Sequence, residues 1–105
     1  MAWVYLVLAG LFEIGWPVGL KMAQQTETRT TGIIVAVAFM AASGLLLWLA
    51  QKQIPIGTSY AVWTGIGATG TFLVGIVFYG DPTSFGRYLG VALIVAGVAT
   101  LKLSH

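Results

Sequence analysis

Charge is scarce in this chain, whose 105 residues include only five Lys or Arg, three Asp or Glu and one His. A soluble domain carries charge on about a quarter of its residues, so this chain has too little to cover a water-facing surface. Its net charge of +2 comes without a basic run, which argues against nucleic acid as a partner. Cysteine is absent, which excludes disulfides and zinc-thiolate sites. Most of the surface must therefore face lipid.

Hydrophobic residues make up 58% of the sequence and gather in four stretches, at about residues 2–22, 32–50, 58–79 and 87–103. At about 1.5 Å of helix per residue, each stretch is long enough to cross about 30 Å of hydrocarbon. Because a helix satisfies its own backbone groups, we predict an all-α membrane protein with four transmembrane helices in a single domain, 1–105. The first stretch lacks a basic leader, so we expect a retained span rather than a signal peptide.

Short polar breaks separate the four stretches. Pro55 and Gly57 interrupt the chain between the second and third spans. Gly80, Asp81 and Pro82 predict, in that order, the end of the third helix, the N-cap of the fourth and its first helical residue.

The positive charges are almost evenly divided between the two membrane sides. Four spans place both termini on one side, with Lys52 and Lys102, whereas Lys21, Arg29 and Arg87 lie on the other. The orientation of a membrane protein follows the difference in positive charge between its two sides. Two positive charges on one side and three on the other favour neither orientation strongly. One interpretation is that the N-terminal amine or local hydrophobicity selects a single orientation. The other is that the chain inserts both ways and pairs head to tail.

Glu13 is the only acidic residue inside a predicted span, about 18 Å along the first helix. An ionisable group at that depth is costly and is a functional-site hypothesis by default. The alternative is a permanently protonated acid that bonds to a neighbouring helix. No Lys, Arg or His lies in a span to neutralise it. This favours a site that takes a proton or a cationic ligand.

Three neighbours share the Glu13 face of the first helix: Gly10, Trp16 and Pro17, at i−3, i+3 and i+4. The Trp16 indole can donate a hydrogen bond to the carboxylate or cover a bound cation, although simple packing is the alternative. Pro17 has no N–H, so the carbonyl of Glu13 loses its helical partner and we expect a kink there.

Further candidates lie in the second and third spans. Tyr60 and Trp63 are three residues apart and share one face, although a pair of aromatic residues at the membrane interface is the alternative. Ser43 is the only hydroxyl in the central part of the second span. It either bonds the carbonyl four residues before it or holds a carboxylate. The sequence leaves these alternatives open.

The fourth span carries a stripe of small residues and no candidate residue for binding or catalysis. Gly90 and Gly97 are seven residues apart, as expected of a helix–helix seam, and are candidates for a subunit interface. One chain of four helices leaves no lumen for a polar solute. A transport function therefore needs at least two copies, whose Glu13 carboxylates would titrate as a coupled pair.

Four segments carry a family resemblance: AGLFEIGW at 9–16, GLK at 19–21, IPIGTSYAVWTGIGA at 54–68, and the stripe from Gly90 to Gly97. With them, the chain resembles the small multidrug resistance family of proton-coupled bacterial exporters over essentially its whole length. Trp16 together with residues 63–68 looks most like the guanidinium exporter subtype, since the quaternary-ammonium subtype usually has a smaller residue near position 16.

The resemblance implies an antiparallel, dual-topology homodimer in the bacterial inner membrane, in which Glu13 binds protons and substrate in alternation. It implies that the binding site is lined by Trp16, Ser43, Tyr60 and Trp63, and that Gly90 and Gly97 form the dimer contact. Three positions depart from the usual pattern: Pro17 replaces a small residue, Ser59 an Ala, and Asp81 a Glu. The first two flank the site and bear on substrate preference.

The implied function is export of guanidinium and small guanidinyl cations, with protons and substrate competing for paired Glu13 carboxylates. The proton gradient drives it and no cofactor is needed. One alternative is export of quaternary ammonium compounds through a looser pocket, and another is a membrane assembly subunit that transports nothing. An enzyme is not expected, because no nucleophile, metal-ligand cluster or phosphate loop accompanies Glu13.

Overall fold

The computed structural model describes residues 1–104, and the regular structure in that range is entirely helical. Its helices are α1 (Ala2–Glu13), α2 (Gly15–Met22), α3 (Arg29–Ala50), α4 (Ile56–Tyr79) and α5 (Phe85–Ser104). Together α1 and α2 form one span, so that four segments are long and apolar enough to cross a membrane. The predicted class, an all-α membrane protein with four transmembrane helices, is confirmed.

The first span is interrupted at Ile14, between α1 and α2. The Ile14 N–H donates to the carbonyl of Leu11, three residues back, at 3.2 Å. Pro17 explains the break, because its ring leaves the carbonyl of Glu13 without a helical donor and crowds it. The kink expected from the sequence therefore falls directly after the acidic residue.

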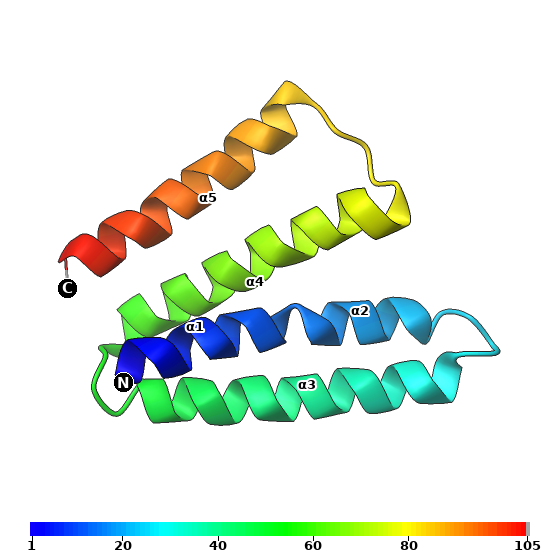
Figure 1. Ribbon diagram of the computed structural model, residues 1–105, viewed down its shortest axis with the longest axis horizontal. Coiled ribbons are helices and arrows are strands. Elements are labelled where there is room, and N and C mark those ends of the chain that lie inside the picture. The colour runs from blue at the N-terminus through cyan, green and yellow to red at the C-terminus, as the bar shows by residue number, and fades with distance from the viewer. Residues whose placement is uncertain (105) are drawn as a thin grey trace.

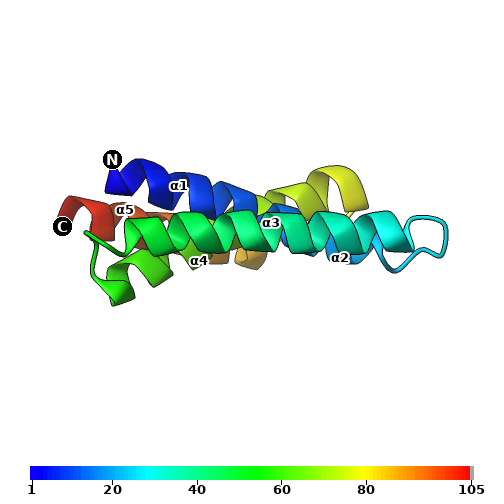
Figure 2. The same ribbon diagram turned by 90° about the horizontal axis from the view of Figure 1, so that it is seen from below.

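The helices are arranged as a flat layer with one arm. Both α1 and α2 lie against α3, α1 also lies against α4 on its other side, and α5 leans away from α4 (Figure 1). Seen from below, the layer is thin, and the chain measures 45 × 35 × 16 Å (Figure 2). The start of α1 and the end of α5 lie at one end, opposite the loops 23–28 and 80–84.

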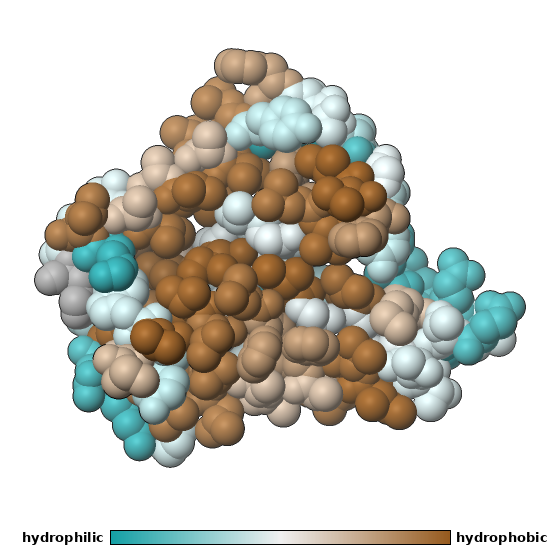
Figure 3. All heavy atoms as spheres, viewed as in Figure 1, coloured by the Kyte–Doolittle hydropathy of each residue, from teal (hydrophilic) through white to brown (hydrophobic). Residues whose placement is uncertain are grey.

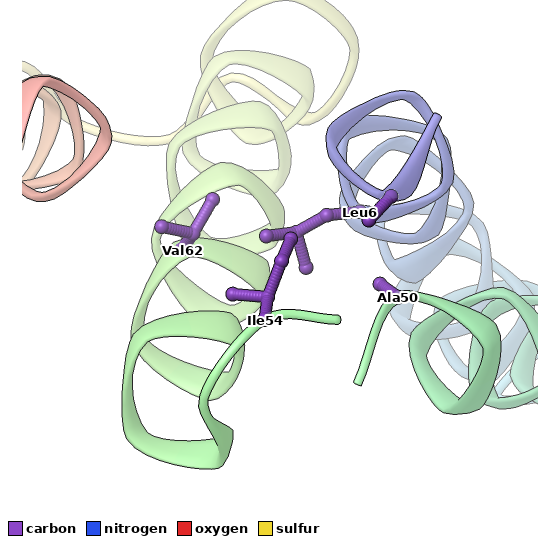
Figure 4. Packing of buried hydrophobic residues seen from close by; sticks show 5 residues of the cluster. Leu6, Ala50, Ile54 and Val62 are labelled. Carbon is purple, nitrogen blue, oxygen red and sulfur yellow. The ribbon is translucent and has the colours of Figure 1, made fainter. Parts of the chain in front are cut away.

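The hydrophobic core is small and lies at the end that carries the termini. Leu6, Ala50, Ile54 and Val62 are buried there, contributed by α1, α3, the following loop and α4 (Figure 4). The remaining contacts between helices depend on small residues. A methyl group on Gly19 of α2 would lie 2.5 Å from the backbone nitrogen of Ala36 in α3. Such close backbone approach is typical of helices that associate within lipid.

Large apolar side chains dominate the outer surface. The space-filling view shows them over the middle of the molecule, with hydrophilic residues gathered toward its two ends (Figure 3). Within the described part of the chain, α5 has no buried residue at all. Such an apolar surface is stable in contact with lipid hydrocarbon or with another protein, but not in contact with water.

The link between α4 and α5 corrects one expectation. Gly80 adopts the left-handed conformation, with φ of 65°, and ends α4 as predicted. Asp81 is not the N-cap and Pro82 is not the first helical residue, because α5 begins at Phe85. Ser84 caps it instead, its hydroxyl accepting a hydrogen bond from the Arg87 N–H at 3.2 Å. Residues 81–84 therefore form an extended connection.

Two further helices begin before their apolar stretches. α3 starts at Arg29 rather than at about 32, and the Gly32 N–H bonds to the carbonyl of Thr28 at 2.8 Å. α4 starts at Ile56 rather than at about 58, directly after Pro55. Hydropathy marks the part of a helix that lies in lipid, whereas backbone hydrogen bonding continues into the polar turn beyond it.

Candidate functional site

Glu13 lines a pocket between the kinked first span and α4. The pocket has a volume of about 270 Å³. Its walls are formed by Glu13, Trp16, Pro17, Thr64, Gly67, Ala68 and Thr71. The break at Ile14 separates the carboxylate, on the last residue of α1, from the indole, near the start of α2. Even so, both side chains lie in one wall of the pocket.

Gly67 makes room for the acidic side chain. A methyl group on Gly67 would lie 2.5 Å from Cγ of Glu13 and 3.1 Å from its Cβ. The absence of a side chain at this point of α4 therefore lets the Glu13 stem cross directly over the helix backbone. This contact determines where the carboxylate enters the pocket.

Glu13 is half-buried, and its side chain lines the pocket, where the carboxylate oxygens can accept hydrogen bonds. Among residues 1–104, no group donates a hydrogen bond to it and no cation pairs with it. Most buried carboxylates are paired, because burial of an unpaired charge is costly. An unpaired acid beside a pocket is suited to bind a proton or a cation.

Ser43 joins three helices at the level of the site. Its buried hydroxyl donates to the carbonyl of Ala9 in α1 at 2.7 Å and accepts from the Trp63 indole of α4 at 2.8 Å. It bonds neither its own i−4 carbonyl nor a carboxylate. The Trp63 ring is thereby fixed in orientation, and Ser43 acts by holding the indole.

Tyr60 lies outside the pocket that Glu13 lines. Its side chain is 56% exposed, and its ring packs against that of Trp63 with centroids 5.4 Å apart. Ser59, the neighbouring departure from the family pattern, is fully buried and donates to carbonyls of its own helix, those of Pro55 and Ile56. The aromatic pair thus extends from the core to the surface, where a second chain can contact it.

Gly10 lies where α1 packs against α4, and it does not line the pocket. It is buried, and a methyl group there would lie 2.7 Å from Cβ of Ile66 in α4. Its place is therefore the crossing of α1 and α4. Close approach at this crossing brings Glu13, one turn further along, against Gly67.

Known proteins resemble this chain over its full length. Residues 1–94 match the family described as Small Multidrug Resistance protein. A guanidinium exporter of Yersinia pseudotuberculosis is 52% identical over 104 residues, covering 99% of both chains. Guanidinium exporters of Salmonella typhimurium and Escherichia coli are each 46% identical over 104 residues, covering 99% of this chain and 98% of their own.

The chain belongs to the small multidrug resistance family. With four apolar helical spans and this membership, it is a multi-pass protein of the bacterial inner membrane. The relatives are named as transporters, which agrees with the absence of a catalytic pattern in the sequence.

Small multidrug resistance proteins form dimers, and the predicted contact of Gly90 and Gly97 lies on α5. Both glycines are exposed, and a methyl group on either would meet nothing within 4 Å. This part of α5 therefore has room for a close partner helix. The dimer contact itself stays a prediction.

Four wall residues of the pocket, all on α4, were not predicted as site residues. Thr64, Ala68 and Thr71 follow one another at i, i+4 and i+7 on α4 and form a stripe that faces Glu13. Gly67 is the fourth of these residues. The signal was a row of small and hydroxyl residues in an apolar helix, which is equally typical of simple helix packing.

Proposed function

We propose that this protein exports guanidinium and small guanidinyl cations in exchange for protons, with Glu13 as the group that binds both. The observation that supports this most directly is the Glu13 carboxylate, which is unpaired within the described chain and lines a pocket between apolar helices. The names of the relatives supply the substrate class. No cofactor is required, because the proton gradient supplies the drive.

Guanidinium suits the chemistry of this pocket. It is planar and weakly hydrated, and it donates two parallel hydrogen bonds to one carboxylate. The ring of Trp16 lies in the same wall and can cover a face of the cation. Thr64 and Thr71 add hydroxyl oxygens that can accept further N–H groups.

Exchange follows from competition for one acid. A protonated Glu13 has no charge with which to hold a cation, and a cation bound to its carboxylate leaves no room for the proton. If each side of the membrane reaches the site in turn, protons that enter release the cation outward. The kink beside Glu13 and the small thickness of one chain support the idea that a second copy closes the pocket.

The complete site is formed by an antiparallel homodimer with dual topology, in which two Glu13 residues face one another. This proposal is supported by the exposed α5 face and by the near balance of positive charge at the two ends. Trp63, whose indole is held by Ser43, and Tyr60, whose ring packs against Trp63, then contribute to the shared cavity. Two equivalent conformations of such a dimer open it to opposite sides.

The test is guanidinium flux in liposomes that contain only this protein and carry a proton gradient. We expect proton-driven guanidinium transport, which Glu13→Gln abolishes because the amide cannot exchange a proton. Glu27→Gln is the matched control, since Glu27 lies in the exposed loop 23–28 away from the pocket. A bulky quaternary ammonium compound should compete poorly.

Three results would contradict the proposal. Coupled transport that persists in Glu13→Gln would remove Glu13 from the mechanism. Faster transport of the bulky compound than of guanidinium would favour the multidrug alternative. No flux of either cation in folded, reconstituted protein would favour a subunit that transports nothing.

A further inference from the structure

A second pocket adjoins the one that Glu13 lines and continues toward the loop end of the molecule. It has a volume of about 160 Å³. It is lined by Pro17, Val18, Lys21, Thr71, Val74, Gly75, Tyr79 and Asp81. Pro17 and Thr71 belong to the walls of both pockets, so the two spaces are neighbours. We call this second space the vestibule.

The α4 terminus directs an acidic group into the vestibule. Gly80 turns the chain back in the left-handed conformation, and the Asp81 N–H bonds to the carbonyl of Gly75 at 3.1 Å. The Asp81 carboxylate then lies against Gly75, where a methyl group would collide with its Oδ2. Asp81 is thus held over the last turns of α4, although it follows the helix in sequence.

A lysine and an aromatic ring complete the vestibule. Lys21 is in the last turn of α2, and its Nζ lies 5.8 Å from the centroid of the Tyr79 ring. A carboxylate attracts an organic cation by charge and hydrogen bonding, and an aromatic face attracts it by a cation–π contact. Lys21 therefore places its own ammonium where a small organic cation would be attracted.

We propose that the vestibule is a second cation site, at which substrate cations bind before or after Glu13 and displace Lys21. Asp81 attracts the cation, Tyr79 covers it, and the Lys21 ammonium acts as a tethered competitor that occupies the space when no cation is present. This inference rests on the proposed function, since it gives the vestibule the same substrate. In a dimer with dual topology, one vestibule lies at each membrane surface.

Opposite effects of the two charges distinguish this role from a structural one. If Asp81 and Lys21 only stabilised the loop end, replacement of either residue would change KM for guanidinium in the same sense. If they form a cation site with a tethered competitor, Asp81→Asn weakens substrate binding and Lys21→Met strengthens it. The expected changes are modest, because both groups are exposed and partly screened by salt.

The experiment measures guanidinium flux over a range of concentrations in liposomes. We expect KM to rise about two- to fivefold in Asp81→Asn and to fall about twofold in Lys21→Met, as exposed charges allow. Lys21→Arg keeps a tethered cation, so it should not reproduce the fall in KM expected of Lys21→Met. Glu27→Gln removes an acid from the other loop on the same side and should not change KM. Added NaCl should reduce the difference between wild type and Asp81→Asn.

The outcomes separate the two proposals. If wild type transports guanidinium but Asp81→Asn and Lys21→Met leave KM unchanged, or shift it in the same direction, the vestibule proposal is overturned and the proposed function stands. An equal shift in Glu27→Gln would also overturn it, since the effect would then be general surface charge. If wild type transports no guanidinium, both proposals are overturned for that cation.

Discussion

A single hydroxyl group organises the interior next to the site. Ser43 bridges the backbone of Ala9 and the indole of Trp63, so α1, α3 and α4 meet at one buried oxygen. The sequence identified Ser43 as unusual, but neither of the two partners considered for it is the observed one. The partner depends on how each helix is rotated about its axis, and hydropathy does not fix rotation when every face of a helix is apolar.

Loss of this hydroxyl should disturb both the fold and transport. Ser43→Ala leaves the partly buried Trp63 N–H without its acceptor, which should lower the free energy of unfolding by about 1–3 kcal/mol and raise KM for guanidinium. Ser59→Ala is the matched control, because Ser59 is equally buried but donates only to carbonyls of its own helix. Detergent unfolding and liposome flux measure the two effects. Equal losses in both variants would contradict an orienting role for Ser43.

The contact between Gly67 and Glu13 also belongs to the scale of single residues. In Gly67→Ala the new methyl group would lie 2.5 Å from Cγ of Glu13, so the acidic side chain must move. A shift of about 1 Å at a reacting group can reduce its rate about a hundredfold, so we expect transport to fall at least about tenfold. Alanine also favours helix over glycine, so the protein should still fold.

Gly57→Ala provides the comparison for that prediction. Gly57 lies in the first turn of the same helix, and a methyl group there would meet nothing within 4 Å. It should transport guanidinium at nearly the wild-type rate. Normal flux in Gly67→Ala, or an equal loss in Gly57→Ala, would remove Gly67 as the residue that positions the acid.

Among whole elements, the spans were predictable and the connections were not. Long apolar runs indicate transmembrane helices directly, and Pro17 indicated the kink after Glu13, because a missing N–H has a fixed effect four residues back. Asp81 and Pro82 resembled the start of a helix but belong to the extended connection before Ser84. Asp81 and Ser84 are both residue types that cap helix N-termini, and the sequence alone does not indicate which of the two is the cap.

The kink itself should be required for transport but not for folding. Pro17→Ala restores the donor to the carbonyl of Glu13 and should join α1 and α2 into one helix. The free energy of unfolding should rise, by up to about 3 kcal/mol, while guanidinium flux falls because Glu13 and Trp16 change their relative placement. Pro55→Ala is the control, since Pro55 stands at the N-cap of α4 and interrupts no helix. A variant that is more stable and fully active would show that the kink is dispensable.

At the scale of the whole molecule, the described chain is a thin layer of helices with one helix, α5, at its edge. It is 16 Å thick along its shortest axis, little more than one helix with its side chains, and α5 buries nothing. The pocket at Glu13 has walls from the first span and from α4 alone, and no other described helix covers it. The sequence predicted a partner copy for a related reason, since four helices enclose no lumen. It could not give the relative placement of the helices, which packing alone determines.

Dual topology gives a prediction about the balance of charge. Wild-type chains with a C-terminal reporter should place it on both sides of the membrane, because Lys52 and Lys102 nearly balance the three positive charges at the loop end. Gln24→Lys combined with Gln25→Lys should orient the loops 23–28 and 80–84 inward. Gln51→Lys, Gln53→Lys and Arg29→Gln together should orient the termini inward.

Each of these two oriented variants should transport little guanidinium alone, because an antiparallel pair needs one chain of each orientation. Expressed together, they should recover a large part of wild-type flux, since each then supplies the orientation that the other lacks. Gln24→Asn with Gln25→Asn changes the same loop without charge and should remain active alone, with reporters on both sides. Full activity of an oriented variant expressed by itself would mean that the functional dimer is parallel, and the two Glu13 residues would then approach from the same side of the membrane.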